Sequence, residues 1–268
     1  MSLLVPHRRR LWLYLLTAIT LLFLVAPVIV IVPMSFSGSR FLDFPPKVWS
    51  LRWYDRFFAD ASWYGAMLLS LKLAAVTALI ATPLGVAAAY ALHVGQHALL
   101  RRLHTILLLP LMVPHIILAV GLFYMYVRLG WLGTFGGLLA ANLMMALPFV
   151  VVTTLSGLRD FDMSQELAAR SMGCSRFEAF CRVTLPQISG SIWSGVIFAF
   201  VTALDEVVIA LFVSSGDATT VTKVMFSSLR DEIDPTIAAV SSLLITTALA
   251  VILLARGAAR LTRGRPGT

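Results

Sequence analysis

Charged residues are scarce in this chain of 268 residues. Asp, Glu, Lys and Arg make up 13% of it, whereas they make up about a quarter of an ordinary soluble domain. Apolar residues make up 59%, which excludes an intrinsically disordered chain, and two cysteines are too few for a disulfide scaffold. The class that remains is a membrane protein.

Motifs for several kinds of chemistry are also absent. None of Lys47, Lys72 and Lys223 follows a glycine, so the chain has no phosphate-binding loop of the form Gly-x-x-x-x-Gly-Lys. It has no His-Glu-x-x-His zinc motif and no Gly-x-Ser-x-Gly nucleophile turn. We therefore expect no catalytic residue, metal or cofactor on this chain. His115, between apolar neighbours after Pro114, is expected to pack between helices rather than to bind a ligand.

Six stretches are long and apolar enough to cross a bilayer, which takes about 20 residues. They are residues 11–32, 63–92, 104–127, 136–158, 192–213 and 236–255. We therefore expect an all-α, polytopic membrane protein with a single transmembrane domain over residues 1–268. The first stretch follows three arginines, as a signal peptide would, but it is too long and lacks a small-x-small cleavage site, so it is predicted to be an uncleaved anchor.

The distribution of Lys and Arg predicts the orientation, because cytoplasmic loops carry the excess. One set of segments carries thirteen: Arg8, Arg9, Arg10, Arg101, Arg102, Arg159, Arg170, Arg176, Arg182, Arg256, Arg260, Arg263 and Arg265. The alternate set carries seven: Arg40, Lys47, Arg52, Arg56, Arg128, Lys223 and Arg230. Both termini are therefore predicted to be cytoplasmic. The net charge of +8 follows from the same bias, so it indicates lipid contact and no nucleic-acid partner.

The longest predicted cytoplasmic connection, residues 159–190, has the pattern of two short helices. Asp162 followed by Gln165 has the form of a capped helix start, and Gly173 is predicted to end that helix in a left-handed conformation. Ser175 and Glu178 form a second capping box.

Pro186 is expected to close the second helix before the fifth span. Periodicity leaves two roles open for this pair of helices. They would dock into a groove of another protein, or they would lie on the membrane surface with their arginines against lipid headgroups.

The same connection resembles the conserved cytoplasmic loop of ABC-importer permeases, whose pattern is Glu-Ala-Ala, three residues, Gly, nine residues, Ile, one residue, Leu-Pro. The matching residues are Ala168, Ala169, Gly173, Val183, Leu185 and Pro186. One position departs from the pattern, because Leu167 occupies the place of the glutamate and Glu166 lies one residue earlier. On a helix this is a rotation of about 100°, so a contact made by that glutamate would be lost or would come from another angle.

The resemblance covers most of the chain. Three further segments resemble the corresponding parts of permeases of the polyamine and related branch. They are Leu109–Pro114 before Gly121, Ser70–Ala74 and Leu204–Val213. The likeness is greatest to the second permease of spermidine/putrescine importers. The implied solute is a polyamine such as spermidine or putrescine, with another small amine, an amino-acid-like compound or another solute of this branch as the alternative.

The resemblance implies a type I, binding-protein-dependent importer in the bacterial inner membrane, working by alternating access. Its implied partners are a second, different permease, two ATP-binding subunits that hold ATP and Mg²⁺, and an extracytoplasmic binding protein. The loop residues that would couple this chain to the ATPase are Glu166, Leu167, Ala168, Ala169, Arg170, Gly173, Leu185 and Pro186.

Asp205 and Glu206 are the only carboxylates within a predicted span. A carboxylate there costs about 2.5–3.5 kcal/mol on insertion scales, so each should face a cavity or a partner. The functional interpretation is a cation-attracting position on the substrate path, and the alternative is pairing with Lys72 or with a neighbouring subunit. Since adjacent residues on a helix diverge by about 100°, one of the two acids is expected to face the path.

A self-contained secondary transporter or channel is the hypothesis from another class. It would need coupling residues on several helices, and two acids and one lysine within the spans are few for that purpose. It also leaves the spacing around Gly173 without explanation.

Overall fold

The computed structural model describes residues 11–95, 97–231 and 234–263. In these ranges the chain is helical and its β-structure is limited to two isolated bridges, Ser37 with Trp49 and Ser215 with Ala218. The all-α fold class is therefore confirmed. The predicted cytoplasmic arginines Arg8, Arg9, Arg10 and Arg265 lie outside the described residues.

Four helices in the described part of the chain are long and apolar enough to cross a membrane. They are α1 (Leu11–Met34), α3 (Ala61–Val94), α6 (Phe135–Asp160) and α13 (Thr236–Arg263). Two bent pairs reach that length together: α4 (Ala98–Met112) with α5 (His115–Leu129), at 103°, and the segment Arg176–Gln187 with α10 (Ser189–Asp205), at 77°. Counting each pair as one span gives up to six, the number expected, although the second pair begins at Arg176, inside the predicted loop, and not at residue 192.

Two of the predicted spans are divided rather than continuous. The stretch 104–127 is split between α4 and α5, where Val113 has an extended backbone (φ −89°, ψ 133°), as a residue before proline prefers. The stretch 192–213 is split after Asp205, and α11 (Val208–Val213) follows as a separate short helix.

The chain forms two compact units. One consists of Met1–Ala61 and Ser228–Thr246, and the other of Ser62–Ser227 and Thr247–Thr268. In the first, α2 (Arg52–Ala59) is held by hydrogen bonds and an ion pair. Tyr54 OH lies 2.8 Å from Ser35 Oγ, and Arg56 Nη2 lies 3.3 Å from Asp234 Oδ2.

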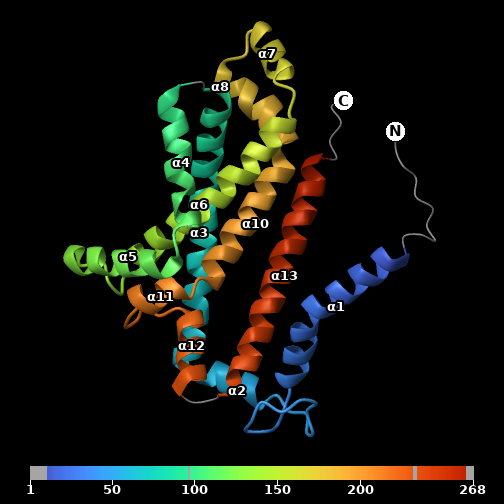
Figure 1. Ribbon diagram of the computed structural model, residues 1–268, viewed down its shortest axis with the longest axis vertical. Helices are drawn as coiled ribbons and strands as arrows, with labels where there is room; N and C mark the ends of the chain where they lie inside the picture. Colours follow the sequence, from blue (N-terminus) through green and yellow to red (C-terminus); the bar gives the residue numbers. More distant parts are fainter. Residues whose placement is uncertain (1–10, 96, 232–233, 264–268) are drawn as a thin grey trace. The chain divides into compact units, whose positions relative to one another are not determined.

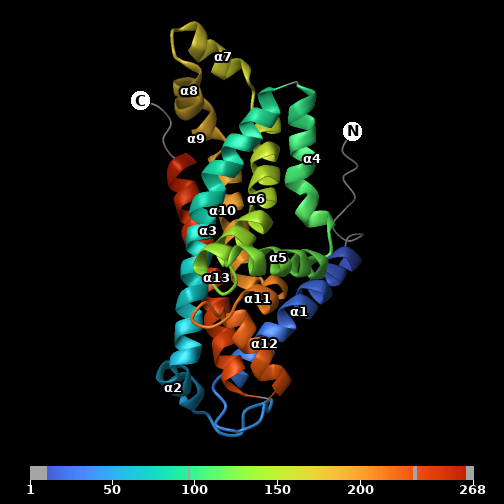
Figure 2. The same cartoon turned by 90° about the vertical axis from the view of Figure 1, so that its left-hand side faces the viewer.

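In the second unit, α3, α6 and α10 run side by side, and α7 (Ser164–Ser171) lies at one end of them (Figures 1 and 2). The helices α5 and α11 contact each other and cross the direction of this bundle (Figure 2). The apolar cluster at the crossing draws residues from α3, α5, α6 and α11, among them Leu73, Tyr126, Met145, Ile209 and Val213. The crossing is therefore a packed part of this unit.

Close packing of the bundle depends on two glycines that face Val150 of α6. A Cβ added at Gly85 of α3 would lie 2.6 Å from Val150 Cγ1, and one at Gly195 of α10 would lie 3.3 Å from Val150 Cα. Small residues allow helix backbones to approach each other in a membrane, where the hydrophobic effect does not drive helices together. The two glycines therefore fix how near α3 and α10 come to α6.

Candidate functional site

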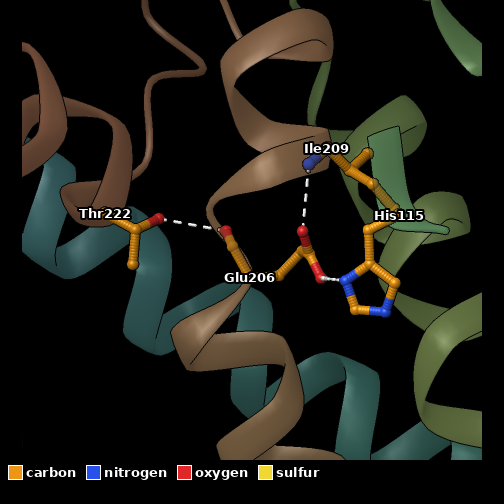
Figure 3. A network of polar contacts seen from close by, with 4 residues as sticks. All are labelled: His115, Glu206, Ile209 and Thr222. Carbon is orange, nitrogen blue, oxygen red and sulfur yellow. Dashed lines mark hydrogen bonds and ion pairs between the residues drawn. The ribbon is translucent and has the colours of Figure 1, made fainter. Parts of the chain in front are cut away.

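The break between α10 and α11 is held by Glu206. Its backbone is extended (φ −69°, ψ 106°), so α10 ends at Asp205. Its Oε1 accepts a hydrogen bond from the backbone N–H of Ile209 at 2.9 Å, which satisfies a free donor in the first turn of α11 (Figure 3). Its carbonyl oxygen accepts one from Thr222 Oγ1 at 3.1 Å, on α12 (Val221–Asp231).

His115, the first residue of α5, faces this break. Its Nδ1 lies 3.7 Å from Oε2 of Glu206, and Figure 3 shows the imidazole beside the carboxylate. The side chain of His115 is about half exposed, whereas that of Glu206 is 7% exposed. The expectation that His115 packs between helices is therefore wrong, because it lies at the wall of a cavity. The sequence held a signal for this position of His115, because the residue directly follows Pro114, at a helix break.

Both carboxylates line one cavity of about 350 Å³. Its lining residues are His115, Val201, Thr202, Asp205, Glu206, Val207 and Val208. The expected divergence of the two acids assumed an unbroken helix, and the break brings both to the same space. Asp205 is exposed and, within the part of the chain that the structure describes, its carboxylate has no hydrogen-bond or ion-pair partner.

Lys72 does not neutralise these acids. Its Nζ lies 5.3 Å from the ring centroid of Phe135, a cation–π contact. Among the described residues, the one basic group found beside Glu206 is His115. The pairing with Lys72 that the sequence left open is therefore not formed, and the cavity keeps an excess of acidic groups.

The predicted pair of short helices in the loop is present. Helix α7 ends at Ser171, and Gly173 has φ +98°, a conformation that glycine adopts without the strain a side chain would bring. Helix α8 (Arg176–Ala179) begins with the predicted capping box, in which Glu178 N donates to Ser175 Oγ at 3.3 Å and Ser175 N donates to Glu178 Oε2 at 3.0 Å.

Asp162 does cap the start of the first helix, but Gln165 takes no part, because its Oε1 accepts a hydrogen bond from Gln187 Nε2. Asp162 Oδ1 accepts from Ser164 N at 3.0 Å, and this bond holds the pKa of the Asp162 carboxyl below its ordinary value.

Pro186 does not close the second helix. The segment continues through the π-helical η2 (Phe180–Thr184) into the short α9 (Leu185–Gln187), and it bends after Gln187. Proline is tolerated here because it lies in the first turn of α9, where its missing N–H has no helical partner to lose.

The predicted coupling residues differ in exposure. Leu167, Ala168, Arg170, Gly173 and Pro186 are exposed, and Leu185 is half-buried. Ala169 and Glu166 are buried. Two large apolar side chains that the sequence did not single out, Met172 and Phe177, are 81% and 76% exposed. The outward surface of the loop is therefore apolar with scattered arginines.

Two residues that the sequence did not connect with Glu166 contact it, one on a long helix and one elsewhere in the loop. They are Tyr90 near the end of α3 and Thr184 in η2. Nothing in the spacing of the sequence pairs residues 76 positions apart, so this contact was not predictable from the chain alone.

Residues 81–263 match the protein family described as binding-protein-dependent transport system inner membrane component. The chain is 34% identical over 247 residues to the putrescine transport system permease protein PotI of Escherichia coli K12, covering 90% of this chain and 88% of PotI. It is 29% identical over 234 residues to the spermidine/putrescine transport system permease protein PotC of Haemophilus influenzae, covering 87% of this chain and 91% of PotC.

The fold is also similar to a solved structure. A chain of a bacterial ABC transporter involved in the import of the acidic polysaccharide alginate superimposes with a TM-score of 0.73. The match covers 94% of this chain and 96% of that one at 16% identity, so the likeness concerns the fold.

Proposed function

Because the chain belongs to the family of binding-protein-dependent transport system inner membrane components, we propose that it is the permease subunit of an ATP-driven importer whose solute is a polyamine such as putrescine or spermidine. The resemblance that the loop motif indicated is confirmed by the family match. The solute, the partner subunits and the roles of single residues are the parts that we propose.

The observation that carries the polyamine assignment is the acidic cavity at the helix break. A polyamine carries several ammonium groups, and the cavity presents Asp205 and Glu206 with the hydroxyl-bearing Thr202 in its lining. An ammonium group has three donors and no acceptor, so carboxylates and hydroxyls are its matching partners. The names of PotI and PotC, relatives over most of this chain, agree with such a solute.

The position of this cavity also suits a transport path. Transporters commonly bind solutes where helices are interrupted, because unwound backbone and helix ends supply polar groups inside the membrane. Here α10 ends at Asp205 and α5 begins at His115, and both residues line the cavity. Asp205 is the better candidate for the ammonium contact, since Glu206 already bonds to Ile209.

An exposed stripe of α10 supports a second permease as partner. Ser194, Phe198, Thr202 and Asp205 recur at helical spacing, so they share one face, and all but the half-buried Thr202 are exposed. Hydrocarbon tolerates an exposed aspartate poorly, so a second protein surface should face this stripe across a polar path. This chain would then form half of the pathway.

The loop between α6 and α10 would dock on an ATP-binding subunit. Leu167, Met172 and Phe177 expose large apolar side chains there, which fits insertion into a cleft better than exposure to water. Two such subunits would hold ATP and Mg²⁺, and an extracytoplasmic binding protein would deliver the solute. The positive-inside bias of the sequence favours a cytoplasmic position for the loop and both termini. In that orientation, ATP-driven closure would move the loop and open the path outward.

The test is uptake by proteoliposomes that contain this chain with its second permease, ATP-binding subunits and binding protein. We expect accumulation of labelled putrescine or spermidine that requires ATP inside the vesicles, survives an uncoupler of the proton gradient and is not shared by an anionic solute. Uptake that proceeds without ATP and collapses with the proton gradient would instead establish a secondary transporter. ATP-driven uptake of an uncharged or anionic solute alone would overturn the polyamine assignment.

A further inference from the structure

A carboxylate is buried at the base of the loop between α6 and α10. Glu166 belongs to the eight-residue helix α7, yet it is 1% exposed. Its Oε1 accepts a hydrogen bond from Tyr90 OH at 2.5 Å, and its Oε2 accepts one from Thr184 Oγ1 at 2.5 Å. Both oxygens are therefore occupied by donors of this same chain.

The two donors belong to different elements. Tyr90 lies four residues before the end of α3, and Thr184 is the last residue of η2, from which the chain continues through α9 into α10. Glu166 therefore joins the loop helix α7 to the end of one long helix and to the segment that leads into another. Hydrogen bonds weaken steeply as their length and angle change, so the three elements are linked in a fixed geometry.

Tyr90 is held from a second side as well. Arg176 Nε donates a hydrogen bond to Tyr90 OH at 3.3 Å, and the ring centroid of Phe180 lies 4.5 Å from that of Tyr90. The second helical segment of the loop thus also contacts α3 at this residue. Tyr90 is therefore one residue of α3 that both halves of the loop contact.

The neighbouring residue lies on the exposed side of α7. Leu167 is 54% exposed, and it occupies the position where the loop pattern has its glutamate. Glu166 would reach a partner subunit only by breaking both of its hydrogen bonds and leaving the hydroxyls of Tyr90 and Thr184 without this acceptor. Glu166 is therefore directed into the permease and not toward its surface.

We infer that Glu166 is a positioning residue that transmits displacement of the loop to α3 and α10. This inference rests on the proposed function, because it assumes that an ATP-binding subunit moves the loop. Displacement of α7 pulls on Tyr90 and Thr184 together, since both bond to one carboxylate. Without these bonds the loop would still dock, but it would slide over α3 and move the two long helices less.

The test measures ATP hydrolysis and solute uptake in the same proteoliposomes, with the complete importer. Thr184→Val and Tyr90→Phe each remove one hydroxyl and keep the shape of the side chain. We expect both variants to assemble with the ATP-binding subunits and to hydrolyse ATP, while the solute imported per ATP falls by about threefold to tenfold. Glu166→Ala should lower this ratio at least as far.

Two controls separate coupling from folding. Thr184→Ser keeps the hydroxyl that Thr184→Val removes, and it should import as much solute per ATP as the wild type. Thr153→Val removes a threonine hydroxyl that bonds to Phe149 O and Val150 O inside α6, and it should leave the ratio unchanged. A loss of assembly would appear as less ATPase co-purified with the permease, which none of these hydroxyl variants should cause.

The decisive comparison is made in the Glu166→Ala background. If Tyr90 and Thr184 act through Glu166, then Tyr90→Phe and Thr184→Val should have no further effect on the ratio there. The inference would be overturned if wild type and both hydroxyl variants imported the same amount of solute per ATP. It would also be overturned if either hydroxyl variant lowered this amount further in the Glu166→Ala background. Absence of ATP-dependent uptake by the wild-type importer would instead count against the proposed function.

Discussion

The Nδ1 atom of His115 lies 3.7 Å from Oε2 of Glu206, so the residue that begins α5 contacts the residue that follows the end of α10. Two interrupted helices therefore meet at one cavity. Glu206 uses its other oxygen to accept from Ile209, whereas the described structure gives Asp205 no partner. The two adjacent acids consequently have different roles, and each role can be tested separately.

Asp205→Asn should lower the maximal rate of polyamine uptake about 10- to 100-fold, because a hydrogen bond to a charged group contributes about 1.5–3 kcal/mol. The substitution keeps the size of the side chain and removes its charge. The measurement is ATP-driven uptake by proteoliposomes with equal amounts of permease. Asp217→Asn, at an exposed loop position outside the cavity, is the matched control and should transport normally. Normal transport by Asp205→Asn would show that its carboxylate is not on the path.

Substitutions of Glu206 should affect stability first. Glu206→Ala removes the acceptor for Ile209 N–H, and loss of such a capping bond costs about 1 kcal/mol. We expect the unfolding midpoint of the purified permease to fall by about 2–4 °C. Glu206→Gln keeps an acceptor at the same place and should retain most of the midpoint. If Gln lowers the midpoint as much as Ala does, the charge rather than the cap holds the break.

His115→Lys should weaken uptake of a cationic solute while the protein remains folded. A lysine ammonium is a strongly hydrated point charge on a flexible stem, and from position 115 it would reach the acids that the solute needs. We expect the uptake rate to fall about 10-fold, because the lysine ammonium would occupy one charge-assisted hydrogen bond that the solute would otherwise make. His115→Gln introduces no charge and is the control. Equal uptake by the Lys and Gln variants would show that no cation binds beside His115.

The loop hairpin was predictable because its signals are local. Asp and Ser caps and a glycine at the end of a helix act over three or four residues, and the structure confirms Ser175 with Glu178 and the positive φ of Gly173. The prediction that Pro186 closes the second helix failed for a similar local reason. Its missing N–H matters only in a helix interior, and the π-helical turn before it places it in a first turn instead.

The break after Asp205 was not predictable from periodicity. No glycine or proline marks it, and the residues after Glu206 are apolar and fit a continuing helix. What holds the break is a side-chain bond to Ile209 together with Thr222, which is 16 residues away and comes close only in the folded chain. The sequence therefore placed the acids in a span, while tertiary contacts decided that both line one cavity.

Gly173→Pro should abolish ATP-driven uptake while leaving the permease in the membrane. Proline fixes φ near −65°, which is incompatible with the φ of +98° observed at Gly173. Gly173→Ala should have a smaller effect, since a Cβ there meets no atom within 4 Å and the cost is backbone strain of about 1–2 kcal/mol. Gly65→Ala, in a helical conformation with equally open surroundings, is the control. Unchanged uptake by Gly173→Pro would refute a coupling role for this turn.

Gly195→Val should destabilise the permease by separating α10 from α6. The first carbon of the new side chain would lie 2.8 Å from Thr153 Oγ1 and 3.3 Å from Val150 Cα, and the latter is backbone that cannot rotate away. Overpacking of this kind costs about 1–3 kcal/mol, so the unfolding midpoint in detergent should fall by several degrees. Gly136→Ala in α6, where a Cβ meets nothing within 4 Å, should leave the midpoint unchanged. A normal midpoint with normal uptake in Gly195→Val would mean that α10 and α6 tolerate a wider spacing, and that the close approach of these helices is not needed for stability.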